Sequence, residues 1–285
     1  MTIISQENQP LWQLLLTAFP ESNRTRIKKM ISLGCVSINR AVVRRADVPV
    51  AKGQKVEFRK YEPRKQHREK APFSIVFEDD FFLAVIKPAG ILSSGRTTEK
   101  TRSMLGMVRS YLKTRERRDV EVFVVHRLDR EVSGLLLFAK TERVQQWFKD
   151  NWNSVEKYYY ALVNAVPSAK KGTIDTFLCE DDRQKMQVSV QGGESAMRAV
   201  THYKVKETHG DYSLLEVQLE TGRKNQIRVH LAHIGHSIVG DFKYGKKSNI
   251  QTDGICLFAY LLIFPHPITN RRIKIEINPP NWSKI

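Results

Sequence analysis

Cysteine is scarce in this sequence. Three cysteines occur among 285 residues, at Cys35, Cys179 and Cys256. Because their number is odd and they lie far apart, they form neither a disulfide framework nor the Cys-x-x-Cys pairs of a zinc site. Reduced thiols are typical of proteins in a reducing compartment. We therefore predict a cytoplasmic protein without a structural metal.

Long apolar runs are missing as well. No stretch approaches the ~20 apolar residues that span a bilayer, and the opening MTIISQENQPLW lacks the basic start and apolar run of a signal peptide. The chain also lacks the phosphate-loop pattern GxxxxGK(S/T), the dinucleotide pattern GxGxxG, the zinc-protease pattern HExxH and the hydrolase pattern GxSxG. His230 and His233 form the best-spaced pair of histidines, but no carboxylate lies close to them in sequence, so we predict no metal site there either.

Acidic residues are few in comparison with basic residues. The chain has 47 Lys and Arg against 30 Asp and Glu, a formal net charge of +17. Such a field attracts polyanions, and neutralising phosphates releases counterions. Nucleic acid is the expected partner. An anionic membrane surface is the alternative, but no strongly apolar, Lys-flanked amphipathic helix supports it.

The sequence divides at a polar segment. RKYEPRKQHREKAP, residues 59–72, contains two prolines and no hydrophobic period, which predicts a linker. We accordingly predict a small N-terminal domain over 1–60, a linker over 61–72 and a catalytic domain over 73–285. Residues 1–70 hold 15 Lys and Arg against 6 Asp and Glu, a surplus of nine positive charges in a quarter of the chain.

The N-terminal part predicts one basic helix followed by short strands. Apolar residues recur with a roughly helical period from Ile27 to Leu33, and Gly34 can end the helix. CVSIN and KVEF then alternate as strands around the turn AKGQ. Four basic residues lie at the start and on the outer side of the helix, and we predict that they contact RNA phosphates, the alternative being a solvated basic face; they are Arg24, Arg26, Lys28 and Lys29.

After the linker the sequence is rich in strands. Nine segments alternate or run apolar, among them FFLAVIKPAG, KYYYALVNAV and GICLFAYLLIF. Helices are expected over 103–113, over 141–153 with Thr141 as N-cap, and over 225–234. Many strands with few helices predict an α+β fold, a largely antiparallel mixed sheet with flanking helices, beside a small N-terminal α/β domain.

Three polar side chains interrupt these apolar segments. They are Asp129 in HRLD, Tyr159 in EKYYYALV and Arg228 in TGRKNQIRVH. Alternation places Tyr159 on the face opposite to Tyr158 and Tyr160. A buried Asp needs a cationic partner, and the planar fork of Arg suits a carboxylate. A structural ion pair with a core tyrosine is an equally weighted alternative from composition alone.

Four motifs in order resemble those of the RluA-type pseudouridine synthases. HRLDREVSGLLLFAK is similar to that family's signature, VFEDDFFLAVIKPAGILSS to its first motif, EKYYYALV to its tyrosine motif, and LETGRKNQIRVHLAHIGHSIVGDFKYG to its last. Val132 stands where the family usually has Thr, and Asn225 where it usually has His. The N-terminal part resembles an S-four-type RNA-binding domain, with Arg40 where that family usually has Gly.

The resemblance implies isomerisation of uridine to pseudouridine within RNA, without cofactor or metal. Asp129 would be the essential carboxylate, acting as nucleophile or as base at the sugar. Tyr159 would stack on the uracil, and Arg228 would pair with Asp129. Arg127 would occupy the place of the flipped nucleotide or contact a phosphate. His126 and Arg223 are also predicted to bind RNA, His126 having a structural role as its alternative.

The expected RNA is ribosomal RNA first and transfer RNA second, and the expected protein is a monomer that does not bind membranes. A different class of function is a catalytically silent RNA-binding or ribosome-assembly protein with the same fold. The joint presence of Asp129, Tyr159 and Arg228 favours the enzyme, because a silent relative has no chemical need for all three.

Overall fold

The computed structural model describes residues 2–32, 34–59, 71–95, 102–116, 119–189, 195–245 and 249–284, apart from the side chains of Lys29 and Lys284. The chain divides into two compact units, residues 1–66 and 67–285. Most of the linker predicted at 61–72 lies outside the described residues. No helix formed by the described residues is long and apolar enough to cross a membrane.

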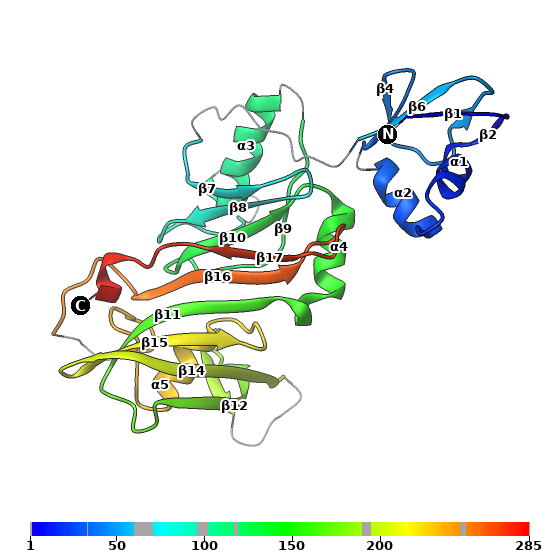
Figure 1. Cartoon of the computed structure of the whole chain (residues 1–285). Helices are drawn as coiled ribbons and strands as arrows, with labels where there is room; N and C mark the ends of the chain where they lie inside the picture. Colours follow the sequence, from blue (N-terminus) through cyan, green and yellow to red (C-terminus); the bar gives the residue numbers. More distant parts are fainter. Residues whose placement is uncertain are drawn as a thin grey trace. The chain divides into compact units, whose positions relative to one another are not determined.

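The first unit packs two helices, α1 (Leu11–Ala18) and α2 (Arg24–Ser32), against short antiparallel strands (Figure 1). Its four-stranded sheet has the order β1-β6-β3-β4, and β2 pairs with β5. The strands are β1 (Thr2–Ile4), β2 (Gln9–Pro10), β3 (Val36–Ile38), β4 (Ala41–Val43), β5 (Pro49–Val50) and β6 (Lys55–Phe58). The predicted basic helix and the two predicted strands are confirmed, whereas α1 was not foreseen.

Turn chemistry explains how α2 and the β3–β4 hairpin end. The Asn23 side chain accepts a hydrogen bond from the Arg26 backbone N–H at 2.9 Å, and Gly34 follows the helix with a φ of +73°. Asn39 and Arg40 both have positive φ, 48° and 70°. Two left-handed residues in a row match the twist of a two-residue hairpin, so Arg40 adopts a conformation that Gly adopts more readily.

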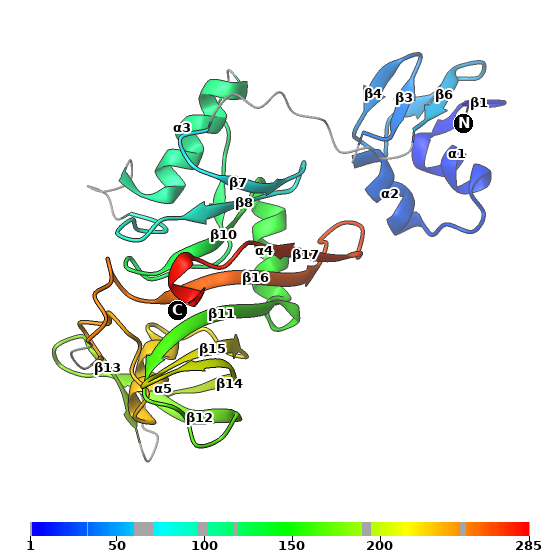
Figure 2. The same ribbon diagram turned by 60° about the vertical axis from the view of Figure 1, so that its left-hand side comes forward.

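The second unit is built on one eleven-stranded sheet (Figure 2), which confirms the predicted α+β class. The order is β13-β12-β14-β15-β11-β16-β10-β8-β7, with β17 on β16 and β9 on β10. Among the described strand pairs, β10–β16 is the only parallel one. The strands are β7 (Ile75–Glu78), β8 (Phe82–Lys87), β9 (Phe123–Val124), β10 (Ser133–Ala139), β11 (Glu156–Asn164), β12 (Lys171–Glu180), β13 (Met186–Ser189), β14 (Met197–His209), β15 (Tyr212–Leu219), β16 (Leu257–Pro265) and β17 (Arg272–Glu276).

The helices cover opposite faces of this sheet. Leu136 and Phe138 of β10 pack in one buried cluster with residues of α3 (Met104–Glu116) and α5 (Gln226–His233). Leu135 and Leu137, one residue out of phase, pack with α4 (Glu142–Asp150) on the other face. All three helices were predicted, and the Thr141 hydroxyl caps α4 by accepting from the Val144 N–H.

Gly134 allows the parallel pairing in the middle of the sheet. It has a φ of +122°, and a Cβ added there would lie 2.2 Å from the Ala259 carbonyl oxygen. A side chain would therefore push β10 away from β16. Ser133 and Gly134 are the two residues of β10 that pair with Phe258 and Ala259.

Candidate active site

Asp129 lies in the turn between β9 and β10, and the segment after β8 holds this turn in place. The Ser93 hydroxyl donates to the Leu128 carbonyl at 2.8 Å and accepts from the Leu128 N–H at 3.0 Å. The buried Lys87 ammonium donates to the carbonyls of Pro88, Ile91 and Arg130. The first and second family-like motifs therefore fold together into one rigid support for the carboxylate.

Tyr159 lies on β11 and faces the cluster shared with α5, whereas Tyr158 and Tyr160 belong to the opposite face. This confirms the alternation expected from the sequence. The side chain is 7% exposed. Burial, and then the charge of Asp129, raise the pKa of the Tyr159 phenol, so the hydroxyl stays protonated at neutral pH.

Arg228 lies on α5 and is shared among three carboxylates. Its Nε and Nη2 donate to Oδ2 and Oδ1 of Asp241, both at 2.8 Å. Its Nη1 is 3.2 Å from Glu131 and 3.5 Å from Asp129. The predicted neighbour Asp129 is thus within reach, but the bidentate partner is Asp241, which the sequence did not single out.

Asp241 is held ionised inside the fold. Its side chain is 0% exposed. Burial alone would raise the pKa of this carboxyl group, but the hydrogen bonds and charge of Arg228 outweigh burial and lower it. Burial alone would lower the pKa of the Arg228 guanidinium, but the hydrogen bonds and charge of Asp241 outweigh burial and raise it. The pair places a fixed positive group beside Asp129.

Among the described residues, Asn225 makes the shortest hydrogen bond to the Asp129 carboxylate. Its Nδ2 donates to Asp129 Oδ2 at 2.5 Å, and its Oδ1 accepts from the Tyr244 hydroxyl at 3.1 Å. The backbone N–H of Met186 donates in turn to the Tyr244 oxygen. Asn225 has a φ of 54°, a left-handed conformation that Asn and His adopt more readily than most residues. The sequence marked Asn225 as a departure from the family pattern but gave it no role.

These side chains surround two adjoining cavities. The first, of about 480 Å³, brings Asp129, Tyr159 and Arg228 together. The second, of about 760 Å³, continues past Asp129 towards Arg130, Phe242 and Lys243. The walls have several residues in common, namely Arg127, Leu128, Asp129, Gly222, Arg223, Asn225 and Arg228. Asp129 therefore stands where the two cavities meet.

The remaining predicted RNA-binding residues divide into two groups. Arg127 and Arg223 line both cavities, and Arg223 Nε donates to the Arg198 carbonyl at 3.0 Å. In the first unit Arg24, Arg26 and Lys28 are exposed on α2, with the Arg24 guanidinium 4.0 Å above the Trp12 ring. The side chain of Lys29 lies outside the described residues.

His126 does not have the environment of a phosphate ligand. It is 8% exposed, and its Nε2 accepts from the Leu137 N–H at 3.2 Å. Burial and the nearby Lys157 lower the pKa of the imidazole to about 4, so it is neutral at physiological pH. RNA binding by His126 stays a prediction, and the buried, neutral imidazole agrees with the structural alternative.

Lys157 is a wall residue that the sequence analysis passed over. It precedes Tyr159 by two positions on β11 and is 3% exposed, with Nζ 5.0 Å from the Trp152 ring. Burial lowers the pKa of its ammonium to about 8. The strand period that separated Tyr159 from its neighbours also places Lys157 on the Tyr159 face, so this signal was present in the sequence.

His230 is a buried structural histidine. Its Nδ1 and Nε2 lie 2.9 Å and 3.1 Å from the hydroxyls of Thr201 and Thr176, and burial lowers its pKa to about 4. Among the described residues no three His, Cys, Asp or Glu side chains are grouped so that they could hold a metal ion.

Comparison with known proteins agrees with this geometry. A family model described as RNA pseudouridylate synthase matches residues 81–233. The chain is 31% identical to the uncharacterised RNA pseudouridine synthase YlyB of Bacillus subtilis, over 96% of this chain and 92% of that protein. It is 30% identical to the ribosomal large subunit pseudouridine synthase D of Zymomonas mobilis, over 94% and 90%.

Solved structures share the fold over about three quarters of the chain. Human RNA Pseudouridylate Synthase Domain Containing 1 matches with a TM-score of 0.61 at 24% identity, covering 77% of this chain and 87% of that one. Human RNA Pseudouridylate Synthase Domain Containing 4 matches with a TM-score of 0.58 at 25% identity, covering 74% and 90%. The ordered motifs, the sheet and the arrangement around Asp129 thus agree with the matches in sequence, and the chain belongs to the RNA pseudouridylate synthase family.

Proposed function

We propose that this RNA pseudouridine synthase converts uridines of large-subunit ribosomal RNA to pseudouridine, acting as a monomer in the cytoplasm. Relatives from Zymomonas mobilis and Haemophilus influenzae, each 30% identical over 94% of this chain, are named ribosomal large subunit pseudouridine synthase D. The net charge of +17 suits a long structured RNA. A basic S-four-type unit over 1–60 would add phosphate contacts away from the reacting uridine.

The observation that carries the proposal is the hydrogen bonding of the Asp129 carboxylate. Its Oδ2 accepts from Asn225 and Arg228, and among the described residues its Oδ1 accepts no hydrogen bond. One oxygen is thus anchored while the other is free for a substrate. Asp129 is 27% exposed in its side chain, so a ligand can reach it from the cavities.

In the reaction the N1–C1′ bond breaks, the uracil turns, and a C5–C1′ bond forms. C5 gives up a proton and N1 gains one, so the product is an isomer and no external reactant is consumed. Asp129 Oδ1 either attacks C1′ or removes a proton from the neighbouring sugar carbon, and both roles need an ionised carboxylate. The Arg228 guanidinium, fixed by Asp241, places a positive charge beside that carboxylate.

The base must leave the RNA stack to enter the first cavity, at a cost of a few kcal/mol. Tyr159 would then pack on the detached uracil as a neutral ring, since its raised pKa keeps the hydroxyl protonated. Arg127, on the wall common to both cavities, would fill the vacated position or hold a flanking phosphate.

The test is pseudouridine mapping of total RNA from cells with the gene, without it, and complemented with an Asp129→Asn variant. We expect one or more positions in large-subunit ribosomal RNA to lose pseudouridine without the gene and to stay unmodified with the variant. Loss confined to transfer RNA would overturn the substrate assignment. No change in any RNA would overturn the proposed function.

A further inference from the structure

Phe242 is an exposed aromatic residue that the reaction does not use. It is 94% exposed, whereas the other exposed large hydrophobic residues range from 41% for Phe177 to 59% for Val42. Single apolar residues at the surface are common. A phenyl ring that is almost entirely exposed to water at the rim of an active-site cavity is uncommon, because burying such a ring is worth roughly 1.5–3 kcal/mol.

The turn that carries Phe242 is firmly held. The preceding residue, Asp241, accepts from the backbone N–H groups of Lys243 and Tyr244 and pairs with Arg228. Gly240, with a φ of +75°, lies so close to Gly254 that a Cβ there would be 2.1 Å from the Gly254 carbonyl oxygen. The exposure of the ring therefore results from a fixed backbone that directs it outward.

The ring lies in basic surroundings. The second cavity, of about 760 Å³, is lined by Phe242 together with six Arg and Lys side chains and three carboxylates. The cations are Arg127, Arg130, Arg223, Lys224, Arg228 and Lys243, and the acids are Asp129, Glu131 and Asp253. An exposed aromatic ring within a cationic groove is the arrangement by which proteins bind single-stranded nucleic acid, with bases on the ring and phosphates on the cations.

We propose that Phe242 is a stacking platform for an unpaired base of the substrate RNA, a neighbour of the uridine that enters the first cavity. The two cavities meet at Asp129, so a strand that places one nucleotide beside Asp129 continues into the groove in front of Phe242. Stacking there would compensate for part of the stacking lost when the target uridine leaves the helix. Phe242 would be a positioning residue, and this inference rests on the proposed use of Asp129.

The experiment measures binding of the full chain to a fluorescently labelled single-stranded oligouridylate of twelve nucleotides at fixed salt. We expect Phe242→Ala to weaken binding about tenfold, or ~1.4 kcal/mol, within the range for one base on one ring. Phe242→Trp should retain the affinity and Phe242→Leu should not, because Leu is apolar without a π-face. The matched control is Phe177→Ala, an exposed phenylalanine of β12 outside both cavities, which should bind like the wild type.

The slope of affinity against salt should be the same for all these variants, because no charge is removed. A second measurement replaces one uridine of the probe with 5-iodouridine, irradiates the complex and maps the attached peptide, which should contain Phe242. Wild-type affinity of Phe242→Ala, or equal affinity of the Leu and wild-type proteins, would overturn the proposal. Neither readout requires isomerisation, so a failed ribosomal RNA assignment would leave this test intact.

Discussion

Arg228 and Asp241 form a buried bidentate ion pair, with both hydrogen bonds 2.8 Å long. Arg228 therefore serves two functions, since its third nitrogen is directed at Glu131 and Asp129. From the sequence we expected this guanidinium to pair with Asp129. Removing it should affect the stability of the fold as well as the chemistry.

Arg228→Met should lower the free energy of unfolding by about 3–5 kcal/mol, because it leaves the Asp241 carboxylate buried without its partner. Wild-type Asp241 has a lowered pKa, so its contribution is present above the ordinary Asp value of ~3.9 and is lost as pH falls through the lowered pKa. In the variant, burial should raise that pKa instead. The stability difference between the two proteins should thus be larger at pH 8 than at pH 5 in urea titrations.

The double variant Arg228→Met, Asp241→Leu separates stability from chemistry. It removes both charges, so much of the lost stability should return, whereas the single-turnover rate should stay low because Asp129 still lacks its positive neighbour. Recovery of rate together with stability would show that Arg228 acts only through the fold.

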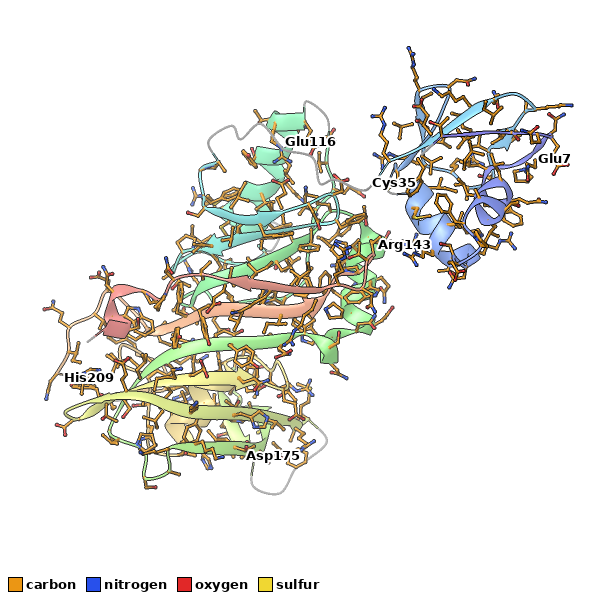
Figure 3. The ribbon with its side chains drawn as sticks, viewed as in Figure 1. Glu7, Cys35, Glu116, Arg143, Asp175 and His209 are labelled. Carbon is orange, nitrogen blue, oxygen red and sulfur yellow. The ribbon has the colours of Figure 1, made fainter. Side chains whose placement is uncertain are left out.

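Asp129→Asn should abolish isomerisation and leave RNA affinity within about twofold, because the amide keeps the shape of the carboxylate but cannot attack or accept a proton. A matched control is Asp175→Asn on β12, labelled in Figure 3, whose carboxylate pairs with Arg198 at the surface. That variant should react like the wild type. A rate for Asp129→Asn within tenfold of wild type, or ~1.4 kcal/mol of barrier, would contradict the assignment.

Asn225→Gly should lower the single-turnover rate by about 10- to 100-fold, since a hydrogen bond to a charged group is worth about 1.5–3 kcal/mol. Gly is chosen because it accepts the φ of 54° without strain. Tyr244→Phe, which removes only the hydroxyl that supports Asn225, should have a smaller effect in the same direction. RNA affinity should change little in both variants, and a loss of affinity without a loss of rate would make Asn225 a binding residue instead.

Lys157→Met should change how stability depends on alkaline pH. The folded pKa of Lys157 is about 8 against an ordinary value of 10.5, so between these values the unfolded chain binds more protons and stability rises with pH. The wild type minus variant difference in unfolding free energy should therefore increase from pH 8 to 10.5, by at most about 3 kcal/mol. Lys149→Met, at an exposed lysine, should show no such trend.

Deleting residues 1–70 should weaken RNA binding and flatten its salt dependence, because the segment carries a surplus of nine positive charges. The rate at saturating RNA should survive, since Asp129, Tyr159 and Arg228 all belong to the second unit. Single-turnover kinetics across an RNA titration measures both quantities. A rate that collapses even at saturating RNA would contradict the assignment of RNA binding to the first unit and of catalysis to the second.

Strand periodicity predicted most of the second unit, including the face of Tyr159, because alternating burial produces an alternation of apolar and polar residues in the sequence. It missed β12 and β13, whose residues are largely exposed or half-buried and so carry a weaker pattern. Asp241 and Asn225 were missed for another reason. Each gains its role from a contact with a residue outside its own helix or strand, Asp241 with Arg228 (13 positions away) and Asn225 with Asp129 (96 positions away). Periodicity carries no information about such pairs.

The parallel contact of Ser133 and Gly134 with Phe258 and Ala259 has a consequence for folding kinetics. Strand β16 lies between β10 and β11 and joins the Asp129 side of the sheet to the Tyr159 side. The paired residues are 125 positions apart in the sequence, and pairing between such distant segments forms slowly because a long loop must close first. The cavity that contains Asp129 and Tyr159 should therefore be completed late in refolding, after the hairpins between neighbouring strands.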